Sequence, residues 1–191
     1  MTRRRLPLLA LIIFVAATAS GCGYNTLTTK KENVKGKWAN VETQLQRRAD
    51  LIPNLVETVK GYATHERSTL DEVTARRADA TRETTVQGTA QADAQFTGLL
   101  GRLMAIAEAY PDLKADDNFR QLSSELSALE GELQGARRYY NATVRDLNTR
   151  IQSFPDTLFA RPMGFTEEPF YEDSDASIQT APKVSFPRPA A

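Results

Sequence analysis

The chain has 191 residues, with 24 Lys and Arg, 24 Asp and Glu, one His and one Cys, so its formal charge is zero. This length allows one domain with a tail. The absence of net positive charge argues against nucleic-acid binding, which generally requires a basic surface. One Cys and one His exclude a disulfide framework and any metal site that needs two such ligands.

The first 21 residues have the organisation of a secretory leader. Arginines at 3–5 precede an apolar run from Leu6 to Ala17, and small residues then lead to Cys22. This order predicts a signal peptide at 1–21. The stretch 19–22 resembles the bacterial lipobox, in which the cysteine is acylated and becomes the new N-terminus. We therefore predict lipidation of Cys22 and attachment to the membrane through this lipid anchor.

The location of the anchored protein follows from the same residues. We expect a bacterial cell membrane, with the chain facing the periplasm or the exterior. Gly23 stands where Asp marks inner-membrane retention in many Gram-negative bacteria, so in such a host the outer membrane is favoured. The alternative is an uncleaved helix in the inner membrane, although the run from Leu6 to Gly21 is shorter than the roughly 20 residues that span a bilayer.

Proline placement divides the rest of the chain. Between residues 23 and 154 the prolines are Pro53 and Pro111, whereas six prolines follow from Pro155 onward. This contrast predicts a helical domain at 22–155. The acidic and proline-containing residues 173–191 are typical of a disordered tail.

The clearest helix is predicted at 116–152. Its apolar residues recur at spacings of three and four: Phe119, Leu122, Leu126, Leu129, Leu133, Ala136, Tyr140, Val144, Leu147 and Ile151. Such spacing is typical of a coiled-coil-like seam. Asp116 or Asp117 is predicted to cap the helix start. A helix of about 55 Å requires partners of similar length.

A second seam predicts another long helix, nearer the N-terminus. Its members are Val34, Trp38, Val41, Leu45, Ala49, Ile52, Val56, Val59, Ala63, Glu66, Leu70 and Val73. The spacing passes through Pro53 without a change of phase, so we predict one long helix with a kink near Pro53. The alternative is two helices within 27–83, separated at 51–53, and Gly61 is a further weak point.

The remaining body is also helical in pattern. We predict a turn at 84–89 and then an amphipathic helix that Pro111 ends. No alternating strand pattern appears. The predicted fold class is all-α: an elongated antiparallel helical bundle of about four helices.

Catalytic and cofactor sites find little support in the sequence. His65 and Glu66 resemble part of a zinc-protease helix, but Thr69 occupies the position of the second His. One His cannot supply the two Glu-x-x-His motifs of a di-iron bundle. Because Cys22 belongs to the lipobox, it is not available as a nucleophile. We predict that the protein is not an enzyme and has no catalytic residues, no metal and no cofactors.

Two polar clusters remain as candidate sites. They comprise Arg47, Arg48, Asp50 and Asn54 around Pro53, and Arg138, Tyr140, Asn141 and Arg145 near the end of the last helix. Arginine pairs well with carboxylates, so these residues can link helices to one another. The other interpretation is a polar groove that binds a peptide or an anionic envelope fragment through its arginines. Periodicity does not separate the two.

These stretches also carry a family resemblance. The run 44–62, QLQRRADLIPNLVETVKGY, followed by His65 and Glu66, resembles the LemA family of bacterial membrane-anchored helical proteins. Further similarity lies in Tyr24-Asn25-Thr26-Leu27, Asn33-Val34, Trp38-Ala39, Tyr140-Asn141-Ala142, Val144-Arg145, Asn148, Ile151, Phe154-Pro155, Ala160, Gly164-Phe165 and Pro169-Phe170. The resemblance covers residues 24 to 172.

The resemblance implies an extended antiparallel bundle outside the inner membrane, with no known catalytic residues. It also implies that a closing segment at 156–172 docks on the bundle. Many family members begin with a membrane helix, whereas this chain offers Cys22. Two functions are expected: a scaffold for an unknown envelope protein partner, or a binding module with an Arg-rich groove. The helix seams can be covered within one chain, but an apolar stripe that stays uncovered would pair two copies, so a homo-oligomer is an alternative to a monomer.

Overall fold

The computed structural model of the protein describes residues 5–63, 65–80 and 82–172. These residues form helices without any strand, which confirms the all-α prediction. The predicted tail at 173–191 lies outside the described residues. The elements are α1 (Arg5–Lys60), α2 (Arg67–Ala80), α3 (Val86–Glu108), α4 (Pro111–Ala115), α5 (Asp117–Gln152) and the short 3-10 helix η1 (Asp156–Leu158).

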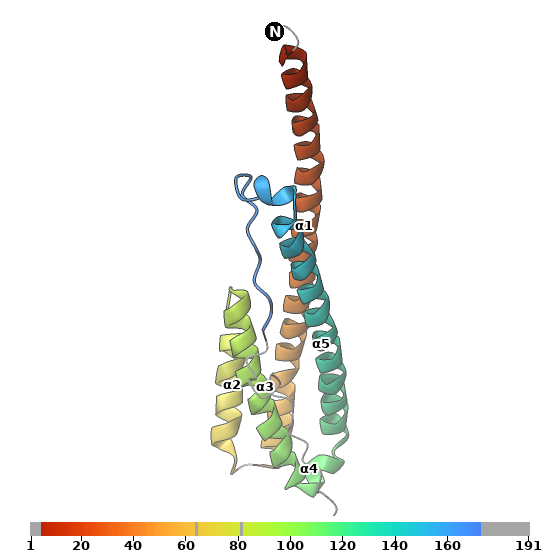
Figure 1. Ribbon diagram of the computed structural model, residues 1–191. Coiled ribbons are helices and arrows are strands. Elements are labelled where there is room, and N and C mark those ends of the chain that lie inside the picture. Colours follow the sequence, from red (N-terminus) through yellow and green to blue (C-terminus); the bar gives the residue numbers. More distant parts are fainter. Residues whose placement is uncertain (1–4, 64, 81, 173–191) are drawn as a thin grey trace, which may run out of the picture.

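The longest helices, α1 and α5, form an antiparallel pair that sets the length of the molecule (Figure 1). Ion pairs between them follow opposite chain directions: Lys30 to Asp146 and Arg47 to Glu132. Just beyond the end of α1 and the start of α5, the Tyr62 hydroxyl donates to Asp116. The α2–α3 hairpin lies against the half of this pair that is remote from the N-terminus. The predicted elongated antiparallel bundle is therefore observed.

The core has two parts because the α2–α3 hairpin covers only part of the α1–α5 seam. In the four-helix part, Ile52, Val59, Phe96, Leu103 and Phe119 pack together. Elsewhere a pair of helices would leave one side of its apolar seam in water. There the chain after α5 returns along the pair, and its buried Ala160, Phe165 and Tyr171 join the seam residues of α1 and α5.

Helix α1 runs through Pro53, as predicted, but it does not continue to residue 73. It ends at Lys60, and the chain turns at Gly61 before α2 begins at Arg67. The expectation of one helix across 27–83 was therefore wrong, since the break lies at Gly61. Glycine disfavours helix, and the turn lets α2 fold back along α1. Leu70 and Val73 still reach the core, but from α2.

Side-chain caps fix two helix starts. Helix α3 begins at Val86, three residues before the end of the turn predicted at 84–89, because Thr85 caps it: the Gly88 N–H donates to the Thr85 hydroxyl at 3.0 Å. Of the two predicted caps, Asp116 is the one that caps α5, and its carboxylate accepts from the Phe119 N–H at 2.9 Å. That bond is the main cause of the lowered pKa of Asp116.

Candidate functional site

The first predicted cluster is divided between solvent and core. Arg47 is exposed and pairs with Glu132 at 2.8 Å, while also donating to Gln44 at 3.0 Å. Arg48, the next residue, is buried with 2% of its surface exposed. Successive residues on a helix point about 100° apart, since a turn takes 3.6 residues. Only Arg48 therefore faces the interior of the bundle.

Arg48 lies in a buried ionic network that joins three helices. Its guanidinium pairs with Asp93 of α3, which is 2% exposed, and with Glu130 of α5 at 3.0 Å. It also donates to the Thr97 hydroxyl at 3.3 Å. The guanidinium carbon lies 5.2 Å from the centre of the Phe96 ring, which adds a cation–π contact.

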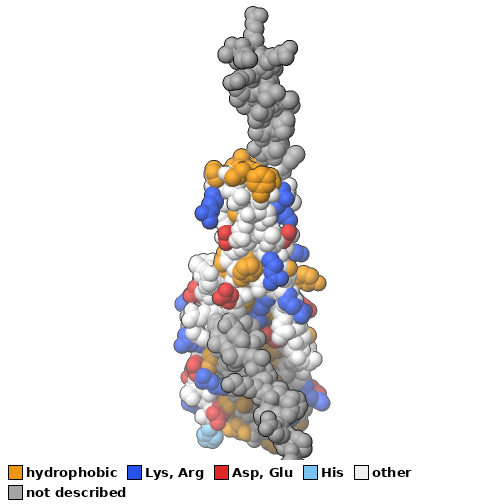
Figure 2. Space-filling model, in the orientation of Figure 1, with side chains coloured by type: hydrophobic (Ala, Val, Ile, Leu, Met, Phe, Trp, Pro, Cys, Tyr) orange, Lys and Arg blue, Asp and Glu red, His pale blue; other side chains and the backbone are white. Residues whose placement is uncertain are grey.

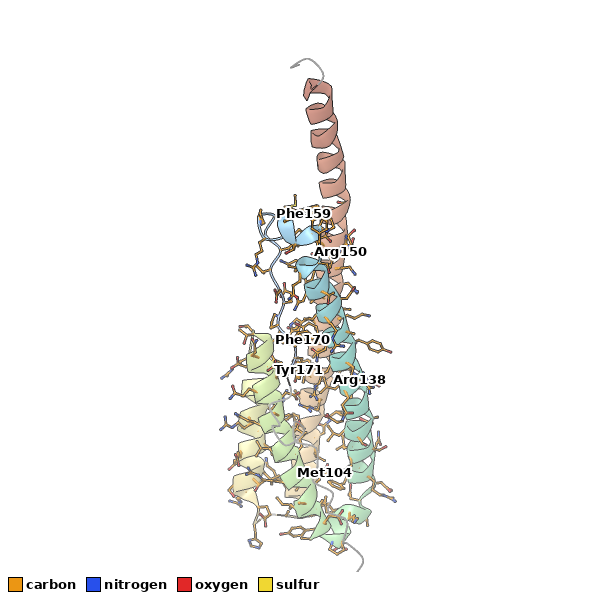
Figure 3. All side chains as sticks on the ribbon, viewed as in Figure 1. Met104, Arg138, Arg150, Phe159, Phe170 and Tyr171 are labelled. Atoms are coloured by element: carbon orange, nitrogen blue, oxygen red, sulfur yellow. The ribbon has the colours of Figure 1, made fainter. Side chains whose placement is uncertain are left out.

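A second arginine and a tyrosine complete this network on the side of α5. Arg137 pairs with Asp93 and lies 3.7 Å from Glu130. The hydroxyl of Tyr171, in the returning chain, donates to Asp93. The guanidinium carbon of Arg137 is 5.1 Å from the Tyr171 ring centre. Asp93 thus accepts from α1, from α5 and from the returning chain, in which Figure 3 labels Tyr171.

The electrostatics of the network favour one protonation state. Two guanidinium groups face two carboxylates, so the charges within it balance. Burial raises the pKa of Tyr171 well above its usual range, and the negative charge of Asp93 raises it further. Tyr171 therefore stays neutral and acts as a donor. Each charge in the network pairs with an opposite charge on another helix or within α5, so the network links α1, α3 and α5.

The residues around Pro53 contribute little to this interior. Asp50 and Asn54 are exposed on α1. Asp50 accepts from Gln46 at 2.8 Å and lies 3.6 Å from Arg77. Arg77 of α2 also donates through Nε to the Ala49 carbonyl at 2.7 Å. This carbonyl is four residues before Pro53, which has no N–H to offer it.

In the second predicted cluster, Tyr140 and Asn141 hold the returning chain. The Tyr140 hydroxyl donates to the Pro169 carbonyl at 2.8 Å. The amide of Asn141 donates to the Tyr171 carbonyl at 3.0 Å and accepts from its N–H at 2.8 Å. Tyr140 is itself 1% exposed, and its ring centre lies 5.2 Å from that of Trp38.

One helical heptad later, Asn148 repeats this reciprocal contact. It donates to the Glu168 carbonyl at 2.8 Å and accepts from the Glu168 N–H at 2.9 Å. The two asparagines thus form hydrogen bonds with the backbone of Glu168 and Tyr171, which lie in the non-helical returning chain. Buried backbone groups require partners, and these side chains supply them where no sheet neighbour exists.

Arg138 and Arg145 lie apart from both networks. Both are exposed on α5, and within the described part of the chain neither side chain forms an ion pair or a hydrogen bond. Arg138 borders a small cavity of about 270 Å³. Its lining residues are Gln134, Arg137, Arg138, Asn141 and Tyr171. The structure therefore brings Arg138 close to Asn141 and leaves Arg145 by itself.

The other sequence candidates have limited surroundings. His65 is exposed in the turn between α1 and α2. Among the residues that the structure describes, no group of three or more potential metal ligands occurs. Across the same residues, no helix is both long and apolar enough to span a bilayer. The Cys22 side chain lies outside the described residues, so its lipidation stays a prediction.

Sequence reasoning missed several members of the networks. Asp93 stands three residues before Phe96, at a seam position where an apolar residue is usual, and that placement was a usable signal. Arg77 gave no such signal because its partner is a backbone carbonyl. The other residues absent from the candidate clusters are Glu130, Arg137, Asn148 and Tyr171, of which only Asn148 was named, in the family resemblance.

Comparisons with known proteins give the chain its family. The magnetosome proteins MamQ 2 and MamQ 1 of Paramagnetospirillum magneticum are each 26% identical over 197 residues, covering 90% of this chain and 72% of the relative. Protein LemA of Metamycoplasma hominis is 23% identical over 152 residues, covering 79% of this chain and 69% of the relative. A model described as the LemA family matches residues 37–186. Because this match spans more than half of the sequence, the chain belongs to the LemA family.

Proposed function

We propose that this chain is a non-enzymatic, membrane-anchored scaffold or adaptor of the cell envelope. It would present its bundle to a membrane or secreted protein partner. The observation that carries the proposal is the internal use of the central polar cluster: Arg48 and Arg137 are paired with Asp93 and Glu130. These pairs fix α1, α3 and α5 against one another. The outer faces of the long helices are left for contact.

The match to the LemA family and the similarity to magnetosome proteins support the membrane-associated part of this proposal. Surface chemistry supports it as well. Arg138, Tyr139 and Arg145 are exposed along α5, and aromatic and arginine side chains are enriched at protein interfaces. Such a face suits a protein partner.

The scaffold proposal is tested by placing a photo-crosslinking residue at position 145 on α5 in living cells. Thr69, on α2, serves as the comparison position on a different helix. A scaffold gives an adduct of one defined mass from position 145 and a different pattern from position 69. The proposal fails if neither position gives a discrete adduct while the protein is present at its normal level.

We propose further that Cys22 carries the membrane anchor, with the outer membrane favoured in a Gram-negative host. The test compares intact mass and membrane partition of the wild type with Cys22→Ala. Wild type should have the mass of a processed, acylated chain, and the variant should be soluble or keep its leader. If both versions keep residues 1–21 and stay in the membrane, the anchor is an uncleaved helix.

A second candidate function is a periplasmic binding module, and the cavity beside Arg138 favours it. An unpaired guanidinium next to the Asn141 amide suits a carboxylate. The test titrates short peptides with a free or an amidated C-terminus by calorimetry. Binding that requires the free carboxylate and weakens about tenfold in Arg138→Gln, but not in Arg145→Gln, supports it. Equal binding of both peptides refutes it.

A further inference from the structure

The segment that links α5 to the returning chain exposes large apolar side chains. We call residues 153–164 the apical loop. Phe154 is 80% exposed, Leu158 67% and Met163 41%. Three such side chains within one short loop differ from the scattered apolar residues of an ordinary surface.

This loop packs on α1 directly beside Cys22. A Cβ atom added to Gly23 would lie only 2.5 Å from the Phe159 ring and 3.1 Å from the Asp156 carboxylate. Gly23 is therefore in close contact with the loop. One residue further, the Tyr24 ring lies 5.5 Å from that of Phe165 in an edge arrangement. The apical loop and Cys22 are at the same level of the bundle.

Internal bonds hold the loop in this arrangement. Asp156 is buried and pairs with Arg150 of α5. The Ala160 N–H donates to the Asp156 carbonyl at 2.8 Å, and the Phe165 N–H donates to the Ala160 carbonyl at 2.9 Å. Because the inward positions are taken by Asp156, Ala160 and Phe165, the turn directs Phe154 and Leu158 outward.

The charge of the exposed loop surface is one-sided. Its only carboxylate, Asp156, is buried against Arg150. Arg161 is exposed, and among the described residues its side chain has no ion pair or hydrogen bond. Figure 2 shows hydrophobic side chains gathered at the end of the bundle from which α1 projects, and Figure 3 places Phe159 and Arg150 at that end. The surface is apolar with a cation and no exposed anion.

We propose that the apical loop is a lipid-contacting surface that seats the bundle on the bilayer. Phe154, Leu158 and Met163 enter the headgroup boundary, while Arg161 faces anionic headgroups. The inference rests on the proposed membrane anchor. Both forms of that anchor place the bilayer at this end. In the lipid form the acyl chains are attached to Cys22, and in the helix form the spanning segment is the apolar run that precedes Cys22. At that level the exposed side chains of Phe154, Leu158 and Met163 are transferred from water into the lipid boundary.

The test uses the full chain isolated from bacterial membranes and reconstituted in vesicles. The vesicles contain phosphatidylethanolamine and phosphatidylglycerol, with plain or brominated acyl chains. Phe154→Trp reports contact with lipid, and Leu158→Trp is a second probe if the first fails to fold. Tyr139→Trp is the matched control, because Tyr139 is an exposed aromatic residue on α5, away from the loop. Trp38 adds the same background to each variant.

We expect the added emission of Phe154→Trp to fall more than about twofold in brominated vesicles, because bromine quenches only at contact with the acyl chains. The emission of Tyr139→Trp should not change. If the chain floats with vesicles but bromine quenches Phe154→Trp no more than Tyr139→Trp, the loop proposal is wrong and the anchor stands. If a blue shift depends on protein concentration and not on bromine, a second copy covers the loop, which also overturns it. Failure of the wild type to float overturns the anchor and the loop proposal together.

Discussion

The Nε of Arg77 donates to the carbonyl oxygen of Ala49 at 2.7 Å, and this bond explains how α1 crosses Pro53. Proline has no N–H, so the carbonyl four residues before it loses its helical partner. Arg77 comes from the neighbouring antiparallel helix and supplies a charged donor instead. The helix therefore continues, although proline usually favours a break in such a position.

Arg77→Met should lower the free energy of unfolding by about 1–3 kcal/mol, because the Ala49 carbonyl loses its donor. In the Pro53→Ala background, residue 53 regains an N–H that can bond to Ala49. The same Arg77→Met change should then cost less. Urea denaturation of the four proteins in a double-mutant cycle measures the difference. Equal costs in both backgrounds would show that Arg77 acts through other contacts.

The neighbouring arginines of the first cluster form a matched pair for a second prediction. Arg48→Met leaves the buried Asp93 with less compensation and should destabilise the protein by about 3–5 kcal/mol. Arg47→Met removes an exposed pair with Glu132 and should cost at most about 1 kcal/mol. Chemical denaturation gives both values. Similar losses for the two variants would contradict the buried network.

The third prediction concerns the attachment of the returning chain. Asn148→Ala removes the side chain that donates to the Glu168 carbonyl and accepts from the Glu168 N–H. The free energy of unfolding should fall by about 1–3 kcal/mol. Hydrogen exchange should rise at residues 165–171 and stay unchanged in α2. Asn54→Ala, at an exposed position of α1, is the control and should have little effect. Unchanged exchange at 165–171 in Asn148→Ala would show that packing alone holds this chain.

The fourth prediction concerns alkaline pH. Burial raises the pKa of Tyr140 to about 12, and burial and Asp93 raise the pKa of Tyr171 as well. Tyrosines in the unfolded chain ionise with a pKa of about 10. The folded state therefore holds these protons more tightly, so the stabilisation is complete below about pH 10 and is lost as pH rises towards the folded pKa.

Removing both hydroxyls tests this pH dependence. In the Tyr140→Phe, Tyr171→Phe double variant, the free energy of unfolding should fall less steeply above about pH 10 than in the wild type. The slopes, measured by urea denaturation at several alkaline pH values, are compared instead of the absolute stabilities, because the variant also loses the bonds to Pro169 and Asp93. Parallel slopes would refute the prediction.

Much of the fold could be predicted because helical seams are local patterns. The spacing from Phe119 to Ile151 placed α5 almost to the residue, and Asp116 marked its start. Similar spacing carried α1 through Pro53. The position of the turn after α1 could not be obtained in this way, since Leu70 and Val73 keep the same phase whether the helix continues or folds back.

The sequence by itself determined most of the helical segments, their apolar faces and the polar residues available for bonding, because each depends on neighbours within a few turns. Only the tertiary structure decided the partners. Arg48 meets Asp93 because α3 packs beside α1. Arg47 is exposed because its side chain points about 100° away from that of Arg48 around the helix axis. Tyr171 reaches Asp93 because Asn141 and Asn148 bind the backbone of an extended chain. Such a chain has no periodicity of its own, so its place follows only from the surface that receives it.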